Sequence, residues 1–261
     1  MSTSIHVSLG QVAAALVLVA LAAAISFWRR TDLERDIVVA TVRSFVQLTA
    51  IGYAIKLIFE ADTIWLVLAL LSVMIVFGTL TARSRAKKVP DAFWPLLIGL
   101  TVAAAATLGL VVALGIFDPT PRYLVPVGGM VIGNAMTASA VALNRLGDEI
   151  SESRSAIEAT LALGASAREA AEPFVRRALR SGTITLVDST KTTGLIFFPG
   201  TMVGMLLAGA DPTDAVRLQL ILLYALLGSV ATSALVATGL AYRSFFTPAQ
   251  QLREPPSAVE V

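Results

Sequence analysis

Seven apolar stretches, each long enough to cross a lipid bilayer as a helix, constrain the fold of this chain more than any other feature. They cover residues 8–28, 37–59, 63–81, 93–116, 123–143, 184–208 and 216–242. A helix of roughly 20 apolar residues spans the hydrocarbon core and satisfies its own backbone hydrogen bonds there. We therefore expect an all-α polytopic membrane protein with about seven transmembrane helices, forming a single domain over residues 1–245.

The composition excludes several other classes of protein. Hydrophobic residues make up 56% of the 261 residues, more than a soluble domain carries. The chain has no cysteine, so disulfides and Cys-zinc sites are excluded, and its one histidine is His6, near the N-terminus. A Ser-His-Asp triad is therefore not expected. The net charge of +2 reflects which way the loops face, and no nucleic-acid partner is expected.

The distribution of basic residues orients the expected helices. With seven spans, 15 of the 20 lysines and arginines fall on one side, and only Arg122 and Arg217 fall on the other. Because Lys and Arg concentrate in cytoplasmic loops, we predict an outside N-terminus and a cytoplasmic C-terminus. Arg29 and Arg30 follow the first apolar run, whereas a signal peptide carries its positive charge before that run. Residues 246–261 contain three prolines and are predicted to be a disordered cytoplasmic tail.

The longest polar segment, residues 144–182, is predicted to be a cytoplasmic loop that contains short helices. Ser155 and Glu158 have the spacing of a capping box, which predicts a helix starting at the next residue, Ala156. Gly164 can end that helix, because glycine adopts the left-handed conformation at little cost. A short exposed helix of this kind can lie on its own protein or dock on a partner.

A second helix is predicted directly afterwards. Ser166 and Glu169 repeat the capping-box spacing, and Pro173 suits the first turn of a further helical piece. Upstream, the acidic cluster Asp148-Glu149-x-x-Glu152 is the only dense group of carboxylates. We interpret it as part of a solvated loop balanced by arginines, so an intramembrane enzyme is not expected.

Two of the predicted spans contain helix breakers and closely spaced small residues. Pro126 lies in the fifth span and Pro199-Gly200 in the sixth, where each can be a plain kink or a hinge beside a substrate path. Gly129-x-x-x-Gly133 and Gly200-x-x-x-Gly204-x-x-x-Ala208 place small residues on one helix face. Such faces allow close helix packing within one chain or at a dimer seam.

Polar residues inside the spans are the candidates for a translocation path. Arg43 and Gln47 are four residues apart and share a helix face. Asp188 and Lys191 are three apart and can pair with each other, and Asn134 lies in the fifth span. Charges at bilayer depth are costly and usually face a protein interior or a wet path. A partnership of Arg43 with Asp188 across helices is a further hypothesis.

Methionines accumulate in the two spans that contain breakers. Met130 and Met136 lie in the fifth span, and Met202 and Met205 in the sixth. Thioethers bind soft metals, but methionine also fills gaps in hydrophobic cores, and both interpretations stay open. Whether any of these residues binds a metal is not determined by the sequence.

Several motifs together resemble a known family. Glu158-Ala159 with Gly164 resembles the start of the Glu-Ala-Ala-x-x-x-Gly loop by which ABC importer permeases dock on their ATPase, although Thr160 stands where that motif has Ala. The remaining motifs, in order, are Arg43-Ser-Phe-Val-Gln47-Leu48, Gly133-Asn134-Ala-Met136, Asp188-Ser-Thr-Lys191, Pro199-Gly200-Thr-Met202-Val-Gly204 and Ala208-Gly209-Ala210-Asp211-Pro212. Over residues 37–245 the chain is similar to the FetB/YbbM-type family of ABC permeases, associated with iron export and related to plant aluminium-tolerance proteins.

The resemblance implies a multi-pass permease of the bacterial inner membrane, pairing as a homodimer with a cytoplasmic ABC ATPase and exporting a metal ion such as iron. The chain itself has no Gly-x-x-x-x-Gly-Lys-Ser/Thr run, so ATP and Mg²⁺ are expected on the partner and no cofactor on this chain. ATPase closure would move the helix at Glu158–Gly164, with Pro126 and Pro199 absorbing the bending. The alternative is a secondary transporter driven by an ion gradient.

Overall fold

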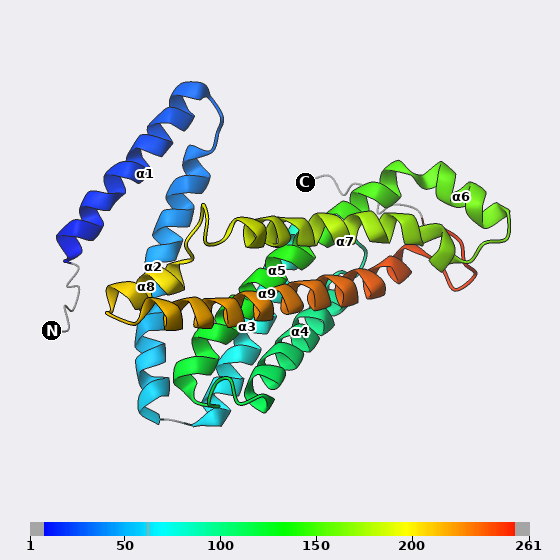
Figure 1. The fold of residues 1–261 in the computed structure, drawn as a ribbon. Coiled ribbons are helices and arrows are strands. Elements are labelled where there is room, and N and C mark those ends of the chain that lie inside the picture. The colour runs from blue at the N-terminus through cyan, green and yellow to red at the C-terminus, as the bar shows by residue number, and fades with distance from the viewer. Residues whose placement is uncertain (1–7, 62, 254–261) are drawn as a thin grey trace.

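The computed structural model describes residues 8–61 and 63–253, and in this part of the chain every regular element is a helix (Figure 1). The elements are α1 (Leu9–Arg29), α2 (Glu34–Ala61), α3 (Ile64–Arg85), α4 (Phe93–Ala113), α5 (Pro121–Glu152), α6 (Arg154–Ala162), α7 (Ala167–Thr192), α8 (Gly200–Leu207), α9 (Pro212–Ala241) and the 3₁₀ turn η1 (Tyr242–Phe245). The all-α prediction is confirmed.

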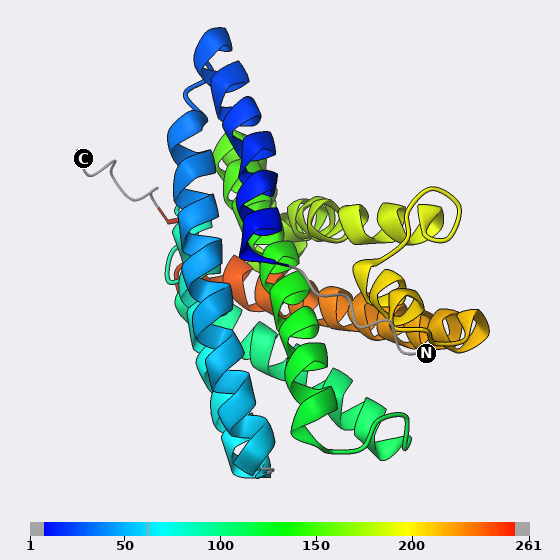
Figure 2. The same ribbon diagram turned by 90° about the vertical axis from the view of Figure 1, so that its left-hand side faces the viewer.

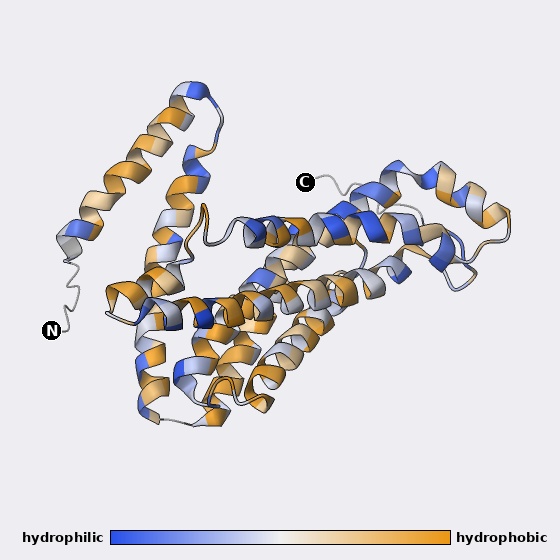
Figure 3. Ribbon diagram, in the orientation of Figure 1, coloured by the Kyte–Doolittle hydropathy of each residue, from blue (hydrophilic) through white to orange (hydrophobic). Residues whose placement is uncertain are grey.

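Six of the described helices are long and apolar enough to cross a membrane: α1 to α5 and the continuous α9–η1 helix. Figure 3 shows apolar residues along these helices, whereas polar residues gather on α6 and the first half of α7. The predicted sixth span, 184–208, is not one helix. It comprises the end of α7, an irregular loop and the eight-residue α8. The seven predicted spans therefore correspond to six long apolar helices and one divided segment.

The polar segments meet at one end of the bundle. Val89 from the α3–α4 turn, Ile150 from α5, Ile157 from α6 and Phe245 from η1 belong to one buried cluster. We call the part of the molecule around these four residues the basic end. Most of the arginines and lysines of the loops belong to the chain segments that contain or adjoin these residues. The turn between α3 and α4, the α5–α6 junction and the end of α9 are thereby brought together.

A second buried cluster forms the opposite end. It contains Leu71 near the start of α3, Leu108 near the end of α4, Leu124 at the start of α5 and Leu222 in the first half of α9. Because the two clusters use opposite ends of the same helices, α3, α4 and α5 alternate in direction, and α9 runs from the opposite end to the basic end. In Figures 1 and 2, α7 lies beside α9 and runs antiparallel to it.

Helix α5 is the central element and packs against α3, α4, α7 and α9. It continues to Glu152, so the predicted loop that began at residue 144 starts as helix instead. Pro126 lies inside α5 without ending it, which corrects the predicted break at that position. Gly182 allows α7 to touch α5, because a Cβ atom there would lie 2.5 Å from the carbonyl oxygen of Ala138. The α5–α7 contact is thus made at backbone distance.

The α1–α2 hairpin extends beyond the rest of the bundle as an arm (Figures 1 and 2). Its turn is held by Ser26, whose hydroxyl donates to Oε2 of Glu34 at 2.8 Å. No residue of α2 is buried, and only its last turns, at Ile55 and Ile58, reach the core. Most of the surface of this arm is therefore left for lipid or protein to cover.

Part of the predicted disordered tail packs on the basic end. Phe246 is buried and its backbone pairs with Leu252 in an antiparallel bridge. The backbone N–H of Arg253 donates to the carbonyl of Phe245 at 2.8 Å. The remainder of the tail, residues 254–261, lies outside the described residues.

Candidate functional site: the carboxyl-terminal half of helix α7

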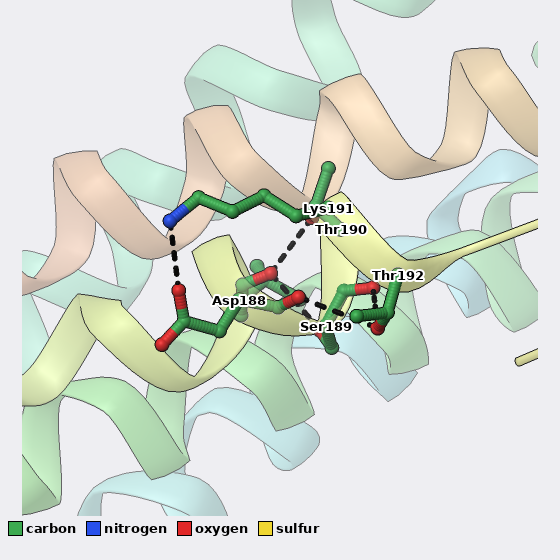
Figure 4. Close-up of polar contacts among 6 residues, drawn as sticks. Asp188, Ser189, Thr190, Lys191 and Thr192 are labelled. Carbon is green, nitrogen blue, oxygen red and sulfur yellow. Dashed lines mark hydrogen bonds and ion pairs between the residues drawn. The ribbon is translucent and has the colours of Figure 1, made fainter. Parts of the chain in front are cut away.

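The predicted Asp188–Lys191 pair is present near the end of α7 (Figure 4). Nζ of Lys191 lies 2.9 Å from Oδ1 of Asp188, three residues back on the same helix. Both side chains are more than half exposed, so the pair is local and solvated within one chain. The local pairing predicted for these residues is confirmed, whereas no described ion pair joins Asp188 to Arg43.

The hydroxyl groups around this pair donate hydrogen bonds to backbone carbonyls of their own helix (Figure 4). Ser189 and Thr190 donate to the carbonyl of Leu186 at 2.9 and 2.7 Å, and Thr192 and Thr193 donate to that of Ser189 at 3.0 and 2.8 Å. Such bonds compete with the regular hydrogen bonding of the helix. They satisfy the donors but leave oxygen lone pairs that can accept from water or bind a cation.

Helix α7 ends at Thr192, and the chain turns before α8. Gly194 has φ of +87°, a conformation that glycine adopts readily, and its N–H donates to the carbonyl of Phe197 at 2.8 Å. Leu195 and Ile196 are more than four-fifths exposed. The predicted break at Pro199-Gly200 is therefore real but larger than predicted, since it covers the whole loop from Thr193 to Pro199, which caps α8.

A cavity of about 170 Å³ lies between α5 and the second half of α7. Its polar side chains are Asn134 and Thr137 from α5 and Thr185 and Ser189 from α7. Asn134 donates through Nδ2 to the carbonyl of Met130 at 2.9 Å, so its own carbonyl oxygen remains an acceptor. The cavity thus presents neutral oxygen groups, the ligand type that hard cations accept.

Sequence reasoning selected Asn134 but missed its neighbours in this cavity. Thr185 and Ser189 are four residues apart, so one helix face carries both, and this spacing could have revealed them. Thr137 is three residues after Asn134 and shares its face in the same way. Isolated hydroxyls are common in membrane helices, so the pairing of the two faces becomes visible only in the structure.

The other predicted path residues lie elsewhere. Arg43 and Gln47 are both exposed on the α1–α2 arm. Met136 packs against the buried clusters, as expected for a core methionine, and Met202 is half-buried on α8. Within residues 8–61 and 63–253, no group of three His, Asp or Glu side chains is placed to hold a metal ion.

The predicted docking segment is helix α6, which is nine residues long. Ile157 is its one buried residue, whereas Glu158 and Ala159 are exposed and Leu163 is 89% exposed. The predicted Ser155–Glu158 capping box is wrong: α6 starts at Arg154, whose Nη2 bonds Oε1 of Glu158 at 3.1 Å.

Both ends of the connection between α6 and α7 follow the predicted chemistry. Gly164 has φ of +91° and donates to the carbonyl of Leu161, while Ala165 donates to that of Thr160, which is a Schellman motif. The Ser166–Glu169 capping box is present at the start of α7. The backbone N–H of Ser166, followed by its hydroxyl, lowers the pKa of Glu169.

Pro173 does not start a new piece but lies inside the continuous α7.

Glu149, one of the carboxylates predicted to lie in a solvated loop, is instead part of the α5–α7 contact. Glu149 is buried and accepts from Arg145 at 2.6 Å and from Arg177 of α7 at 2.7 Å. The guanidinium of Arg177 also stacks over Phe174, 4.8 Å from the ring centre. Asp148 pairs with Lys88 at 2.7 Å, which raises the pKa of that lysine. These pairs join the α3–α4 turn, α5 and α7 at the basic end.

Comparison with known proteins gives a consistent family assignment. The uncharacterised protein family UPF0014 matches residues 9–246. The chain is 38% identical to the UPF0014 membrane protein STAR2 of rice over 92% of this chain and 85% of that protein. It is 39% identical to the protein ALUMINUM SENSITIVE 3 of Arabidopsis thaliana over 92% and 88% of the two chains.

A bacterial relative is similar over the same region. The probable iron export permease protein FetB of Escherichia coli is 35% identical over 92% of this chain and 93% of that protein. No solved structure matches.

Proposed function

This chain belongs to the UPF0014 family, and from that membership we propose that it is the membrane-spanning permease subunit of an ABC transporter that exports a metal ion such as iron. The name of the Escherichia coli relative supports the direction and the class of substrate. ATP and Mg²⁺ would be bound by a separate ATPase subunit, and this chain would not be an enzyme. A bacterial relative named as a permease and the six apolar helices support a place in the bacterial inner membrane.

The observation that carries the proposal is the exposure of α6. A nine-residue helix with one buried side chain gains little from its own protein, because packing of an apolar face stabilises most short helices. Ile157 anchors α6 to the basic end, and Glu158, Ala159 and Leu163 remain exposed. We infer that an ATPase subunit docks on this surface and that force passes through Ile157 to the α5–α7 contact.

The arrangement of α7 and α8 supports a seventh crossing. Helix α7 starts at the basic end beside α9 and runs antiparallel to it, and α8 leads into the start of α9 (Figures 1 and 2). In our proposal this divided segment crosses the membrane, the N-terminus is outside and the basic end is cytoplasmic, in accord with the positive-inside rule. Broken helices of this type surround binding sites in transporters.

We place the export path along the cavity between α5 and α7. Asn134, Thr137, Thr185 and Ser189 would give a cation weak oxygen contacts from which it can leave again. The residues of the Asp188–Lys191 pair lie on either side of Ser189 in the sequence of α7. Pro199 and the loop before it would provide the bending that alternating access needs.

A second copy of the chain is the partner we propose for α8. The small-residue face of Gly200 and Gly204 meets no atom within 4 Å of a Cβ built at either position. A small-residue face allows close helix contact, yet no helix among the described residues packs on it. Since the chain has no native cysteine, Gly204→Cys should form a disulfide-linked dimer in membranes.

The matched control for this cross-link is Gly109→Cys. That glycine also has open space around it but lies on α4, away from the proposed seam. Equal cross-linking of both variants, or none in either, would contradict a dimer through α8.

Co-purification tests the transporter assignment. Tagged protein extracted in mild detergent should bring down a stoichiometric P-loop ATPase, and Glu158→Lys should lose it. Asp214→Lys is the matched control, because Asp214 is an exposed acid in a local pair at the opposite end. Loss in both variants would remove α6 from the docking role. Absence of any ATPase from the intact protein would favour the gradient-driven carrier.

The substrate requires a separate assay. In vesicles that contain both subunits, ATP should drive Fe²⁺ transport away from the ATPase side, and Thr185→Val should slow it several-fold. Thr183→Val is the control, since Thr183 is a hydroxyl two residues away that donates to the carbonyl of Leu179 and does not line the cavity.

A further inference from the structure

A second and larger cavity, about 500 Å³, lies at the basic end beside the end of the α9–η1 helix. Three separate stretches line it: the start of α7, η1 and the returning segment 246–253. The last long apolar helix ends here, at Phe245. The cavity therefore lies where the end of a span would meet the headgroup layer of a membrane.

The lining of this cavity is positively charged. Arg168, Arg243 and Arg253 come from the three different stretches, and none of the ten lining residues is acidic. Within the described residues, no carboxylate forms an ion pair with Arg168 or Arg243. Three guanidinium groups around one cavity repel one another unless an anion joins them.

Hydrogen bonds hold the returning segment 246–253 in place beside the cavity. Oε1 of Gln250 accepts from the backbone N–H of Ala167 at 2.7 Å, which fixes the returning segment to α7. Nη1 of Arg154 donates to the carbonyl of Arg253 at 2.7 Å, and Nε of Arg253 donates to the carbonyl of Phe246 at 3.2 Å. Because Phe246 is buried, its carbonyl holds the Arg253 side chain in a fixed orientation.

Guanidinium groups match phosphate in both charge and geometry, since each can donate two parallel hydrogen bonds to phosphate oxygens. The volume of the cavity is within the range of small-molecule sites and exceeds what one inorganic phosphate fills. Basic pockets at the cytoplasmic ends of spans are where anionic lipid headgroups bind.

We propose that the cavity formed by Arg168, Arg243 and Arg253 binds a phosphate group, carried by the headgroup of an anionic phospholipid or present as free phosphate. This site is separate from the cavity between α5 and α7 and does not depend on the transport function. Binding there would fasten the segment 246–253 to the start of α7, next to the exposed helix α6.

The experiment uses the full chain purified in detergent. Its thermal unfolding is followed while phosphatidylglycerol, phosphatidylcholine or inorganic phosphate is added, since a ligand of the folded state raises Tm with concentration. Phosphatidylglycerol should raise Tm and phosphatidylcholine should not. The double variant Arg168→Gln/Arg243→Gln should weaken phosphatidylglycerol binding by about tenfold or more, because two charge-assisted contacts are lost.

Arg122→Gln/Arg217→Gln is the matched control, because it removes the same charge from the opposite end and should bind phosphatidylglycerol like the parent protein. If inorganic phosphate alone raises Tm as much as phosphatidylglycerol and the effect is lost in the first double variant, the site is confirmed with free phosphate as its ligand. Equal binding of phosphatidylglycerol and phosphatidylcholine, or equal weakening in both double variants, would overturn the proposal.

Discussion

The basic end and the region of α8 with the α1–α2 arm are packed in opposite ways. At the basic end, Ile157 and Leu146 are almost completely buried, and Glu149 is held between two arginines. In contrast, neither α8 nor α2 has a single buried residue. The chain therefore completes the first region by itself and leaves the second for lipid or another protein chain to cover.

The difference follows from the solvent that each region would face. Helices outside the membrane must bury apolar surface, because its contact with water is unfavourable. They must also pair any charge that they bury, because a buried charge loses its hydration. An apolar helix in lipid can remain single, since hydrocarbon solvates leucine as well as a protein core does. Tight packing is thus found at the basic end, and open packing in α8 and α2.

The largest expected effect comes from the α5–α7 contact. Gly182→Leu places a side chain where even a Cβ atom would lie 2.5 Å from the carbonyl oxygen of Ala138, so α7 must move away from α5. We expect a loss of about 3 kcal/mol or more in the free energy of unfolding, the upper range for overpacking. Thermal unfolding in detergent, with yield in the membrane, measures it.

Gly204→Leu is the matched change on α8. Because nothing lies within 4 Å of that position, we expect a change of less than about 0.5 kcal/mol in the unfolding of the monomer. A loss similar to that of Gly182→Leu would show that the α8 region is as tightly packed as the basic end, and the comparison would fail.

Removing a charged side chain should also cost more stability at the basic end than at the exposed end of α7. Glu149→Ala leaves Arg145 and Arg177 without their shared carboxylate at a buried position, and we expect a loss of about 2 kcal/mol. This is less than for a fully buried pair, because both arginines are about half exposed. Chemical denaturation of the purified protein provides the measurement.

Asp188→Asn is the control for that charge change. The Asp188–Lys191 pair is exposed, so its removal should alter stability by less than about 0.5 kcal/mol. If Asp188→Asn destabilised the protein as much as Glu149→Ala, Asp188 would have to make a further stabilising contact, beyond its exposed pair with Lys191.

The cap of α7 allows a smaller test at the basic end. Ser166→Ala removes the hydroxyl that accepts from the backbone N–H of Glu169, and a loss of about 1 kcal/mol is expected. Ser155→Ala should have almost no effect, because Ser155 does not cap α6. The two variants are compared by thermal unfolding. Equal losses of stability would show that Ser155 does cap α6, as the sequence predicted.

The smallest effect concerns pH. Hydrogen bonds from Ser166 lower the pKa of Glu169 in the folded state. A lowered pKa stabilises the fold above the unfolded pKa, and this contribution disappears as the pH falls through the folded pKa. The parent protein should therefore be more stable than Glu169→Gln near neutral pH, and the difference should vanish in acid. A difference that persists unchanged in strong acid would contradict the assigned cause.

The sequence by itself determined the helical class, the positions of the long apolar helices and several local features. Hydropathy located α1 to α5 and α9, because their apolar runs are continuous. The Ser166 capping box, the turn at Gly164 and the Asp188–Lys191 pair depend on residues within five positions of each other, and local geometry is enough to predict them.

Tertiary structure alone decided which polar residues are buried and which faces are open. Glu149 is part of an acidic cluster that suggests a solvated loop. It is buried instead, because Gly182 allows α7 to approach α5 closely and Arg177 of α7 then pairs with it. The cavity between α5 and α7 brings Asn134 beside Thr185, residues about 50 positions apart. Hydropathy records how much apolar surface a segment has but not what covers it, and this coverage distinguishes the basic end from α8.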